Sequence, residues 1–453
     1  MDNRARSLVA LPLAIVPILL SPTLWGFCTE FLASWSGGPP DRQTAKELAA
    51  DAERVTVGGA KLWEIYEGKL LDIEKRSGFA DFYDKQPVTK EELTAKPSVL
   101  LLGSFSTGKT SFIQWLTGKE SRHFHIGPDP TTDFFMAVTY PLKGSTVTDR
   151  LMAGHSATAD RRLPYKGLEK FSHSFLDSFR VLEMDAPILK AITFIDTPGI
   201  QAQAGTKKLG YSRTNVTEWF AERSDLIMVL FDPEKTTISE ELNHLLQVLQ
   251  PFKSKVRYVL NKADRRDMDF SRLVNVYGAI LHKVGMLLRT EEKPRIAITS
   301  LKPWWRFESW RHKEMLDLHK SIIRQELRDL PKHSALATRR EMLIHRARQV
   351  DAHCKLLKHL RESVPLSKAF TGSGLVWLAN HLEEFLETSH NAGVVRENLP
   401  VFDLMLFRKH LIEMSGTSDL YRCTQADFGA LLDIPDAVQQ TSMDSEETSG
   451  VES

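Results

Sequence analysis

The chain has few cysteines and almost no net charge. Its three cysteines among 453 residues are too few and too scattered for a disulfide framework or a zinc site. With 59 basic and 58 acidic residues the formal net charge is +1, so no field of the whole protein favours a nucleic-acid partner. An apolar fraction of 42% and a charged fraction of 26% are typical of a folded globular protein, and the length allows about two to three domains.

Charged residues are also scarce at the N-terminus. Arg4 and Arg6 precede an apolar stretch in which Glu30 is the only charge over residues 7–33. Basic residues ahead of an apolar core predict a hydrophobic leader over residues 1–36, either a signal peptide or a membrane anchor. Three prolines interrupt this stretch and reduce its helical continuity, so a membrane-dipping or disordered leader is the alternative.

The most informative segment is Gly-Ser-Phe-Ser-Thr-Gly-Lys-Thr at 103–110, which fits the pattern G-x-x-x-x-G-K-T. It follows an apolar, strand-like run at 99–102, and a plausible helix begins after it, which is the context of a phosphate-binding loop. Lys109 supplies positive charge for the β- and γ-phosphates, and Thr110 offers a hydroxyl to magnesium. The predicted nucleotide-binding residues of this segment are Gly103, Ser106, Gly108, Lys109, Thr110 and Ser111.

A second motif, Asp-Thr-Pro-Gly at 196–199, follows the strand-like run 191–195. Asp196 is placed to hold magnesium through water, and Gly199 is placed to offer its amide to a γ-phosphate. The alternative for this tetrapeptide on its own is an ordinary turn after a strand.

A third motif, Asn-Lys-Ala-Asp, follows the strand-like run 256–260. Asn261, Lys262 and Asp264 there would form the base-recognition element of a GTPase-type fold. Three such motifs, each at the carboxyl end of a predicted strand, meet at one edge of an open parallel sheet, where ligands bind.

The pattern of apolar runs predicts an α/β fold with two flanking helical segments. Residues 93–302 alternate strand-like and amphipathic stretches, which predicts a mostly parallel sheet covered by helices, the nucleotide-binding domain. Residues 44–92 and 303–430 read as helical and are expected to pack into one helical domain, with Cys354 a small core residue. Residues 431–453 are expected to be a disordered, acidic, Ser-rich tail. A weak calcium-binding or regulatory role is the alternative for the tail.

Gly-Pro-Asp-Pro-Thr-Thr-Asp at 127–133 resembles the G-P-E-P-T-T-D switch of the EH-domain-containing (EHD) ATPases and sarcalumenin, a branch of the dynamin superfamily. Trp-Phe-Ala-Glu-Arg-Ser-Asp at 219–225 and the segment 260–279 are similar to the same branch. The resemblance covers roughly residues 50–425. It implies a dynamin-type G domain, Mg2+ and ATP or GTP as cofactors, and slow, assembly-stimulated hydrolysis in membrane remodelling.

The resemblance also assigns roles to residues. Thr132, the second threonine of the switch, would close on magnesium and position the attacking water, although an N-cap or turn threonine is the alternative. The implied catalytic residues are Thr132, Lys109 and Gly199. The implied metal site is Thr110, Thr132 and Asp196. The base would lie against Asn261, Lys262 and Asp264.

Two positions bear on rate, and one bears on base choice. Phe105 stands where dynamin proper has a glutamine, and Ile200 stands where Ras-like enzymes place a water-orienting glutamine, so slow basal turnover is expected. Asp264 would accept two donors from guanine and repel the N1 acceptor of adenine, which favours GTP. The EHD proteins carry the same motif and are ATP users, which favours ATP.

Other features concern partners and location. Trp304 and Trp305 lie near the G-domain dimer contact of the family, so a homodimer through the G domain is expected, a core or hinge aromatic being the alternative. Membrane lipid is the other expected partner, although residues 362–370, at the family's membrane-binding tip, retain one lysine. No room for an EH domain is expected after the helical region.

The localisation that follows is membrane-associated, in the endomembrane system. It is the lumen of the endoplasmic or sarcoplasmic reticulum if the leader is a signal peptide, and the cytosolic face otherwise. The rival function is a luminal, sarcalumenin-like protein that binds nucleotide or calcium with little catalysis, although the long acidic segment for calcium buffering is absent. An ordinary signalling GTPase is a third candidate, disfavoured by the flanking helical segments.

Overall fold

The computed structural model describes residues 42–124, 134–142, 149–199, 211–235, 240–288, 294–302, 312–365, 367, 373–400, 403–414 and 425–447. Several predicted features lie outside these residues: the leader at 1–36, the switch residue Thr132, Ile200, and the pair Trp304 and Trp305.

An eight-stranded sheet forms the centre of the nucleotide-binding domain, with the order β3-β4-β2-β5-β1-β6-β7-β8. The pairs β2–β5 and β3–β4 are antiparallel and the other neighbouring pairs are parallel, which confirms the predicted mostly parallel sheet. The strands are β1 Ser98–Gly103, β2 Phe135–Thr139, β3 Arg150–Ala153, β4 Phe179–Glu183, β5 Thr193–Asp196, β6 Leu226–Phe231, β7 Val256–Leu260 and β8 Ile296–Ile298.

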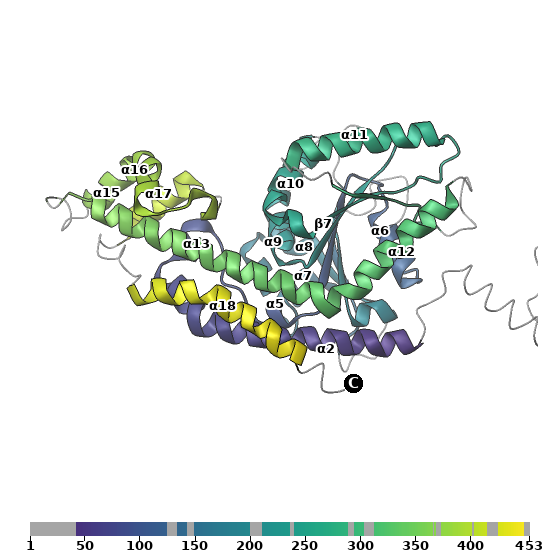
Figure 1. The fold of residues 1–453 in the computed structure, drawn as a ribbon, viewed down its shortest axis with the longest axis horizontal. Helices are drawn as coiled ribbons and strands as arrows, with labels where there is room; N and C mark the ends of the chain where they lie inside the picture. The colour runs from purple at the N-terminus through teal and green to yellow at the C-terminus, as the bar shows by residue number, and fades with distance from the viewer. Residues whose placement is uncertain are drawn as a thin grey trace, which may run out of the picture.

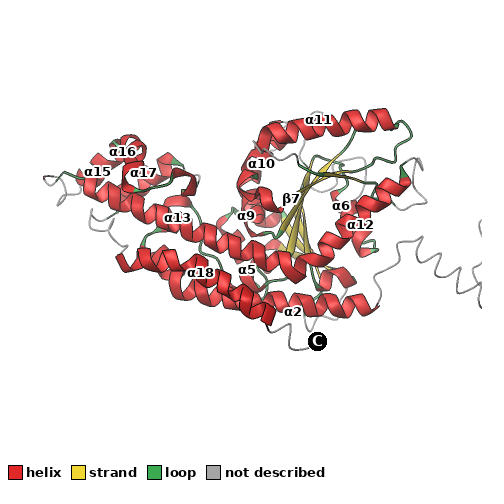
Figure 2. Cartoon of the chain, viewed as in Figure 1, coloured by secondary structure: helices red, strands yellow, loops and turns green. Residues whose placement is uncertain are grey.

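Helices cover both faces of this sheet (Figure 2). In β1, Leu100 and Leu102 belong to the core on one face, and Val99 and Leu101 belong to the core on the other. A strand buried on both faces reads as a continuous apolar run, which is why its position was predictable. The helices are α6 Lys109–Thr117, α7 Gly154–Ala159, α8 His173–Asp177, α9 Arg213–Arg223, α10 Glu240–Val248 and α11 Phe270–Leu288, with the short turns η3 Lys166–Lys170, η4 Pro187–Lys190 and η5 Gln250–Lys255.

The remaining helices form an elongated body beside the sheet (Figure 1). Its segments before the sheet are α2 Arg42–Ile65, η2 Tyr66–Leu70, α3 Leu71–Arg76, α4 Phe79–Tyr83 and α5 Lys90–Thr94. Helix α12 Lys313–Asp329 instead packs on the sheet, where Leu316, Ile323 and Leu327 belong to its two cores. The segments of the helical body after it are η7 Leu330–Ser334, α13 Ala335–Ser363, α15 Ser373–Asn380, α16 Leu382–Thr388, η8 Ser389–Ala392, η9 Arg396–Asn398, α17 Leu404–Glu413 and α18 Gln425–Glu447. The long helix α13 leaves the sheet and reaches α15–α17, while α2 and α18 run along it.

Segments from before and after the sheet share one apolar core in this helical body. Leu62 and Tyr66 from the N-terminal side pack in the same cluster as Leu343 and Leu357 of α13. This places residues far apart in the sequence side by side, as the amphipathic patterns predicted.

The C-terminal segment departs from the sequence prediction. Residues 425–447 form α18, so the expected disorder from residue 431 is wrong for the described part of the tail. Leu431, Ile434 and Val438 are buried in the helical core, at the spacing of three and four residues that one helix face requires. The prediction of disorder rested on the polar composition of residues 431–453, which outweighed this short apolar stripe. Asp427 also pairs with Arg76 of α3, at 2.8 Å.

Cys354 is buried in α13, as expected, and it is disulfide-bonded. Its partner cysteine lies outside the described residues. The small number of cysteines excluded a framework of several disulfides, but the sequence analysis did not predict this single disulfide.

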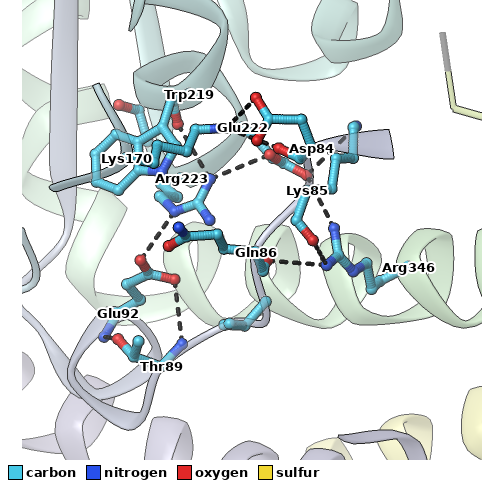
Figure 3. A network of polar contacts seen from close by, with 12 residues as sticks. Asp84, Lys85, Gln86, Thr89, Glu92, Lys170, Trp219, Glu222, Arg223 and Arg346 are labelled. Carbon is cyan, nitrogen blue, oxygen red and sulfur yellow. Dashed lines mark hydrogen bonds and ion pairs between the residues drawn. The ribbon is translucent and has the colours of Figure 1, made fainter. Parts of the chain in front are cut away.

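A polar network joins α9 of the sheet domain to the helical body (Figure 3). Arg346 of α13 pairs with the buried Glu74 and donates to the carbonyl oxygens of Lys85 and Gln86 at 3.1 and 2.9 Å. It also lies 3.9 Å from Glu222 of α9. Burial alone would raise the pKa of Glu222, but the surrounding lysines and arginines together hold that pKa well below its ordinary value.

A second group of contacts in the same network surrounds Arg223 of α9. Arg223 pairs with Glu92 at 3.0 Å, and its guanidinium stacks over the Trp219 ring at 4.3 Å from the centroid. Arg339 of α13 pairs with Asp225 at 3.1 Å. Since these charges are buried and paired across the boundary, they fix how the helical body sits on the sheet domain.

Shortening a buried side chain of α18 tests whether this helix is part of the core. Ile434→Ala removes a side chain that is 1% exposed, and we expect the free energy of unfolding to fall by about 2–5 kcal/mol. Leu432→Ala, at a position 70% exposed on the same helix, is the matched control and should change it by less than about 0.5 kcal/mol. Denaturant titration followed by circular dichroism measures both, and equal effects would contradict the packing.

Candidate nucleotide-binding site

Five loops meet at one edge of the sheet. The turn after β1 carries the phosphate-binding motif, and the loops after β5, β6, β7 and β8 carry the polar side chains around it. These strands are mutually parallel, so their carboxyl ends meet at the same edge, as the three motifs predicted.

The turn after β1 has a backbone that side chains would obstruct. Gly108 has φ +99°, and a Cβ there would lie 2.3 Å from Asn261 Nδ2. A Cβ on Gly103 would lie 2.4 Å from the carbonyl oxygen of Leu230 on the neighbouring strand. Ser106 has φ +61°, a left-handed conformation, and its side chain is exposed. The turn thus presents backbone amides, and α6 begins at its end, so both features favour an anion.

Lys109 is the first residue of α6 and is 6% exposed. Its Nζ donates to the carbonyl oxygens of Gly103 and Ser104, at 3.1 and 3.2 Å, so the ammonium lies against the loop itself. Burial lowers the pKa of Lys109 to about 8, and attraction to Asp196 opposes this change. The ammonium is still present at neutral pH.

Thr110 and Asp196 bring two oxygen ligands together. Thr110 Oγ1 donates to Asp196 Oδ2 at 2.6 Å, and Asp196 is fully buried. The other carboxylate oxygen, Oδ1, has no hydrogen-bond partner within the described part of the chain. Burial raises the pKa of Asp196, and Lys109 and Thr110 oppose the rise.

A hydroxyl and a carboxylate are ligands that Mg2+ accepts, together with substrate phosphates and water. These two residues therefore fit a magnesium ion. Within the part of the chain that the structure describes, no group of three or more histidine, cysteine, aspartate or glutamate side chains could hold a metal ion.

Gly199 lies directly against the phosphate-binding turn. A Cβ at this position would lie 2.6 Å from Phe105 Cα, so a larger residue would push the two loops apart. Thr197 in the same loop donates to the carbonyl oxygen of Leu101 at 2.7 Å and holds it onto β1. The loop after β5 is thus held against the phosphate-binding turn.

The loop after β7 joins the phosphate-binding turn to the loop after β8. Asn261 Nδ2 donates to the carbonyl oxygen of Thr107 at 2.8 Å, and Asn261 Oδ1 accepts from the amide of Leu301 at 3.1 Å. This asparagine therefore holds two loops together, and its contact with the base stays a prediction. Lys262 has φ +62° and its Nζ pairs with Asp232 Oδ2 at 2.8 Å.

Asp264 is 1% exposed at the same edge, and Lys302 Nζ lies 3.7 Å from its carboxylate. The described members of the predicted site are thus assembled at one edge. They are Gly103, Ser106, Gly108, Lys109, Thr110, Ser111, Asp196, Gly199, Asn261, Lys262 and Asp264. Thr132 lies outside the described residues and stays a prediction.

The structure adds polar residues that the sequence analysis did not select. Asp232 follows β6 and pairs with Lys262, while Thr299 and Ser300 follow β8 and are buried. Lys235 Nζ donates to the carbonyl oxygen of Phe105 and lies 5.4 Å from its ring centroid. The rule that selected Asp196 and Asn261, a polar residue directly after a parallel strand, would also have found Asp232 and Thr299.

The chain resembles known proteins over most of its length. Residues 99–263 match the Dynamin family. The chain is 33% identical over 341 residues to EH domain-containing protein 1 of Arabidopsis thaliana, covering 74% of this chain and 60% of that protein. It is 34% identical over 323 residues to EH domain-containing protein 2 of Rattus norvegicus, covering 69% of this chain and 56% of that protein. A solved structure of an oligomerised bacterial dynamin pair aligns with a TM-score of 0.35 at 14% identity, covering 81% of this chain and 55% of that one.

The sheet, the three motifs and the family match define a dynamin-type nucleotide-binding domain. Residues 99–263 thus carry a Dynamin-family domain, and about 70% of the chain is similar to EH domain-containing proteins, the resemblance that the switch motif indicated. The chain spans between half and two thirds of the length of the curated relatives that it matches.

Among the helices that the structure describes, none combines the length and the apolar character needed to cross a bilayer. The apolar leader predicted at 1–36 is outside that set.

The pKa of Lys109 gives the site a pH dependence. Phosphate binding requires the ammonium, so we expect ATP affinity to fall by about twofold between pH 7 and pH 8 and more steeply above pH 8, by at most about tenfold per pH unit. Calorimetric titration with ATP measures this, since adenine does not titrate in that range. Lys109→Met should bind ATP weakly and without this decline. A wild-type affinity unchanged to pH 9.5 would contradict the assignment.

Proposed function

We propose that this chain is a dynamin-like nucleotide hydrolase that cleaves ATP or GTP slowly, associates with membranes and dimerises through its G domain. The observation that carries the proposal is the assembly at one sheet edge of the buried Lys109 ammonium, the Thr110–Asp196 pair and the close approach of Gly199. The EHD relatives support it.

In this proposal each residue either neutralises charge on the phosphates or positions a reacting group. Lys109 neutralises charge at the β- and γ-phosphates, and the Gly199 amide donates to the γ-phosphate. Thr110 and Asp196 hold Mg2+, which supplies charge neutralisation at the phosphate oxygens when it is bound. Thr132 positions the attacking water, the role that the switch motif implies for it.

Slow turnover follows from the apolar side chain beside the phosphates. Phe105 packs against Gly199 and cannot hydrogen-bond a water molecule. Completion of the site by self-assembly would supply the missing polar groups, which is the expected reason for assembly-dependent hydrolysis.

Hydrolysis with and without liposomes tests the proposal. The purified protein should hydrolyse ATP or GTP at less than about 1 per second, and anionic liposomes should raise the rate. Lys109→Ala should abolish hydrolysis in both conditions, whereas Lys253→Ala, an exposed lysine on η5, should leave it unchanged. A basal rate of about 1 per second or faster, or full activity in Lys109→Ala, would contradict the proposal.

Asp264 offers a test of base choice. If guanine is the base, Asp264→Asn keeps an acceptor for only one of the two guanine donors, and GTP affinity should fall by about 10- to 100-fold while ATP affinity does not fall. If adenine is the base, the same substitution should leave ATP binding intact and GTP binding weak in both proteins. Competition titrations against a fluorescent nucleotide distinguish the two outcomes.

We propose a luminal, sarcalumenin-like protein as the second candidate, because one observation favours it. Cys354 is disulfide-bonded, and disulfides persist mainly in oxidising compartments. Full protection from protease inside intact vesicles, with no measurable hydrolysis, would support this candidate. Cleavage by external protease, with Cys354 accessible to a thiol reagent after unfolding, would exclude it.

A further inference from the structure

A second cavity lies between the sheet domain and the helical body. It has a volume of about 220 Å³, and its walls include Thr56 of α2 and Arg339 of α13 as well as residues of β1, β2, β5 and α9. Ser98 and Thr193 line it and are the first residues of β1 and β5. The cavity is therefore at the amino end of these strands, the opposite edge from the nucleotide loops. Domain boundaries are common positions for small-ligand sites.

One end of this cavity carries Lys96, a cation outside the ion pairs of the described residues, toward which the buried Glu183 exerts an electrostatic attraction. Lys96 lines the cavity, and its Nζ donates to Thr139 Oγ1 at 2.8 Å and to the carbonyl oxygen of Leu189 at 2.9 Å. None of the ion pairs among the described residues includes Lys96, and an ammonium has three donors, so one remains for a ligand. Burial lowers the pKa of Lys96 to about 8, so the charge is present at neutral pH.

The other cations of the wall are paired within the protein. Arg223 pairs with Glu92, Arg339 pairs with Asp225, and Arg162 pairs with Asp160. Figure 3 shows Arg223 lying between the Trp219 ring and Glu92, both of which line the cavity. Lys96 is therefore the lining cation that forms no ion pair among the described residues.

Two buried polar groups of the wall are also unsatisfied. Trp219 Nε1 and Ser224 Oγ have no hydrogen-bond partner in the described part of the molecule, and these side chains are 5% and 1% exposed.

Most of the remaining wall is apolar or aromatic. Leu163, Tyr165 and Phe220 line the cavity and are buried. The volume is below the about 300–1,000 Å³ of sites for drug-sized ligands, which limits the occupant to a small molecule.

We propose that this cavity binds a small amphipathic carboxylate, with its anionic group on Lys96 and its apolar body against Leu163, Tyr165 and Phe220. Such a ligand would contact the sheet domain and the helical body at once. Its binding would stabilise the arrangement of the two bodies that Figure 3 shows.

Titration with 2-naphthoate, a flat aromatic carboxylate, tests the proposal. The Lys109→Ala variant serves as the background, so that the phosphate-binding turn does not act as a competing anion site. We expect saturable binding by calorimetry, and at least a tenfold loss of affinity when Lys96→Met is added, because this substitution removes the charge and keeps the apolar stem. Lys358→Met, at an exposed position of α13, is the matched control and should leave the affinity unchanged.

The neutral analogue 2-naphthamide separates charge recognition from apolar burial. It should bind more weakly than 2-naphthoate, and Lys96→Met should not change its affinity. Trp219→Phe provides a second variant, in which a phenyl ring replaces the indole and the N–H donor is lost. Its affinity for 2-naphthoate should be lower than that of the wild type if the indole N–H donates to the ligand. Circular dichroism and the unfolding midpoint verify that each variant folds. Absence of saturable naphthoate binding to the folded protein, or equal affinity in Lys96→Met, would overturn the proposal.

Discussion

Two buried charges of opposite sign at one sheet edge determine the nucleotide-binding site. Lys109 and Asp196 are 6% and 0% exposed, and removing either charge from water is unfavourable unless other charges compensate. In the proposed function, a triphosphate and a divalent cation would provide that compensation. The glycine-dependent turn, the close approach of Gly199 to Phe105 and the bridging role of Asn261 all hold the two charges in this arrangement.

The same sheet domain is connected to the helical body through α9. This helix follows the loop that carries Gly199, and its C-terminal end holds Glu222 and Arg223 within the network around Arg346 and Glu92. In the proposed function, the contact between α9 and α13 carries the effect of nucleotide binding to the long helix.

Much of the fold and site could be predicted because the determining signals are local. A strand buried on both faces is a continuous apolar run, and a phosphate-binding turn is defined by residues adjacent in sequence, so β1 and Lys109 were found together. The partners of the α9 network were not predictable, because Arg346 and Glu74 are 272 residues apart and each reads alone as a surface charge. The helix α18 was missed because its apolar stripe of Leu431, Ile434 and Val438 is short within a polar segment.

The central claim is that Thr110 and Asp196 hold a metal ion beside a bound purine triphosphate. Its most direct test is to titrate wild type, Thr110→Val and Asp196→Asn with ATP and with GTP, in Mg2+ and in EDTA. The account predicts that Mg2+ tightens binding of one nucleotide to the wild type by at least about tenfold, which is about 1.4 kcal/mol, and that both variants lose this effect. Wild-type affinity that is indifferent to Mg2+, or no binding of either nucleotide, would contradict it.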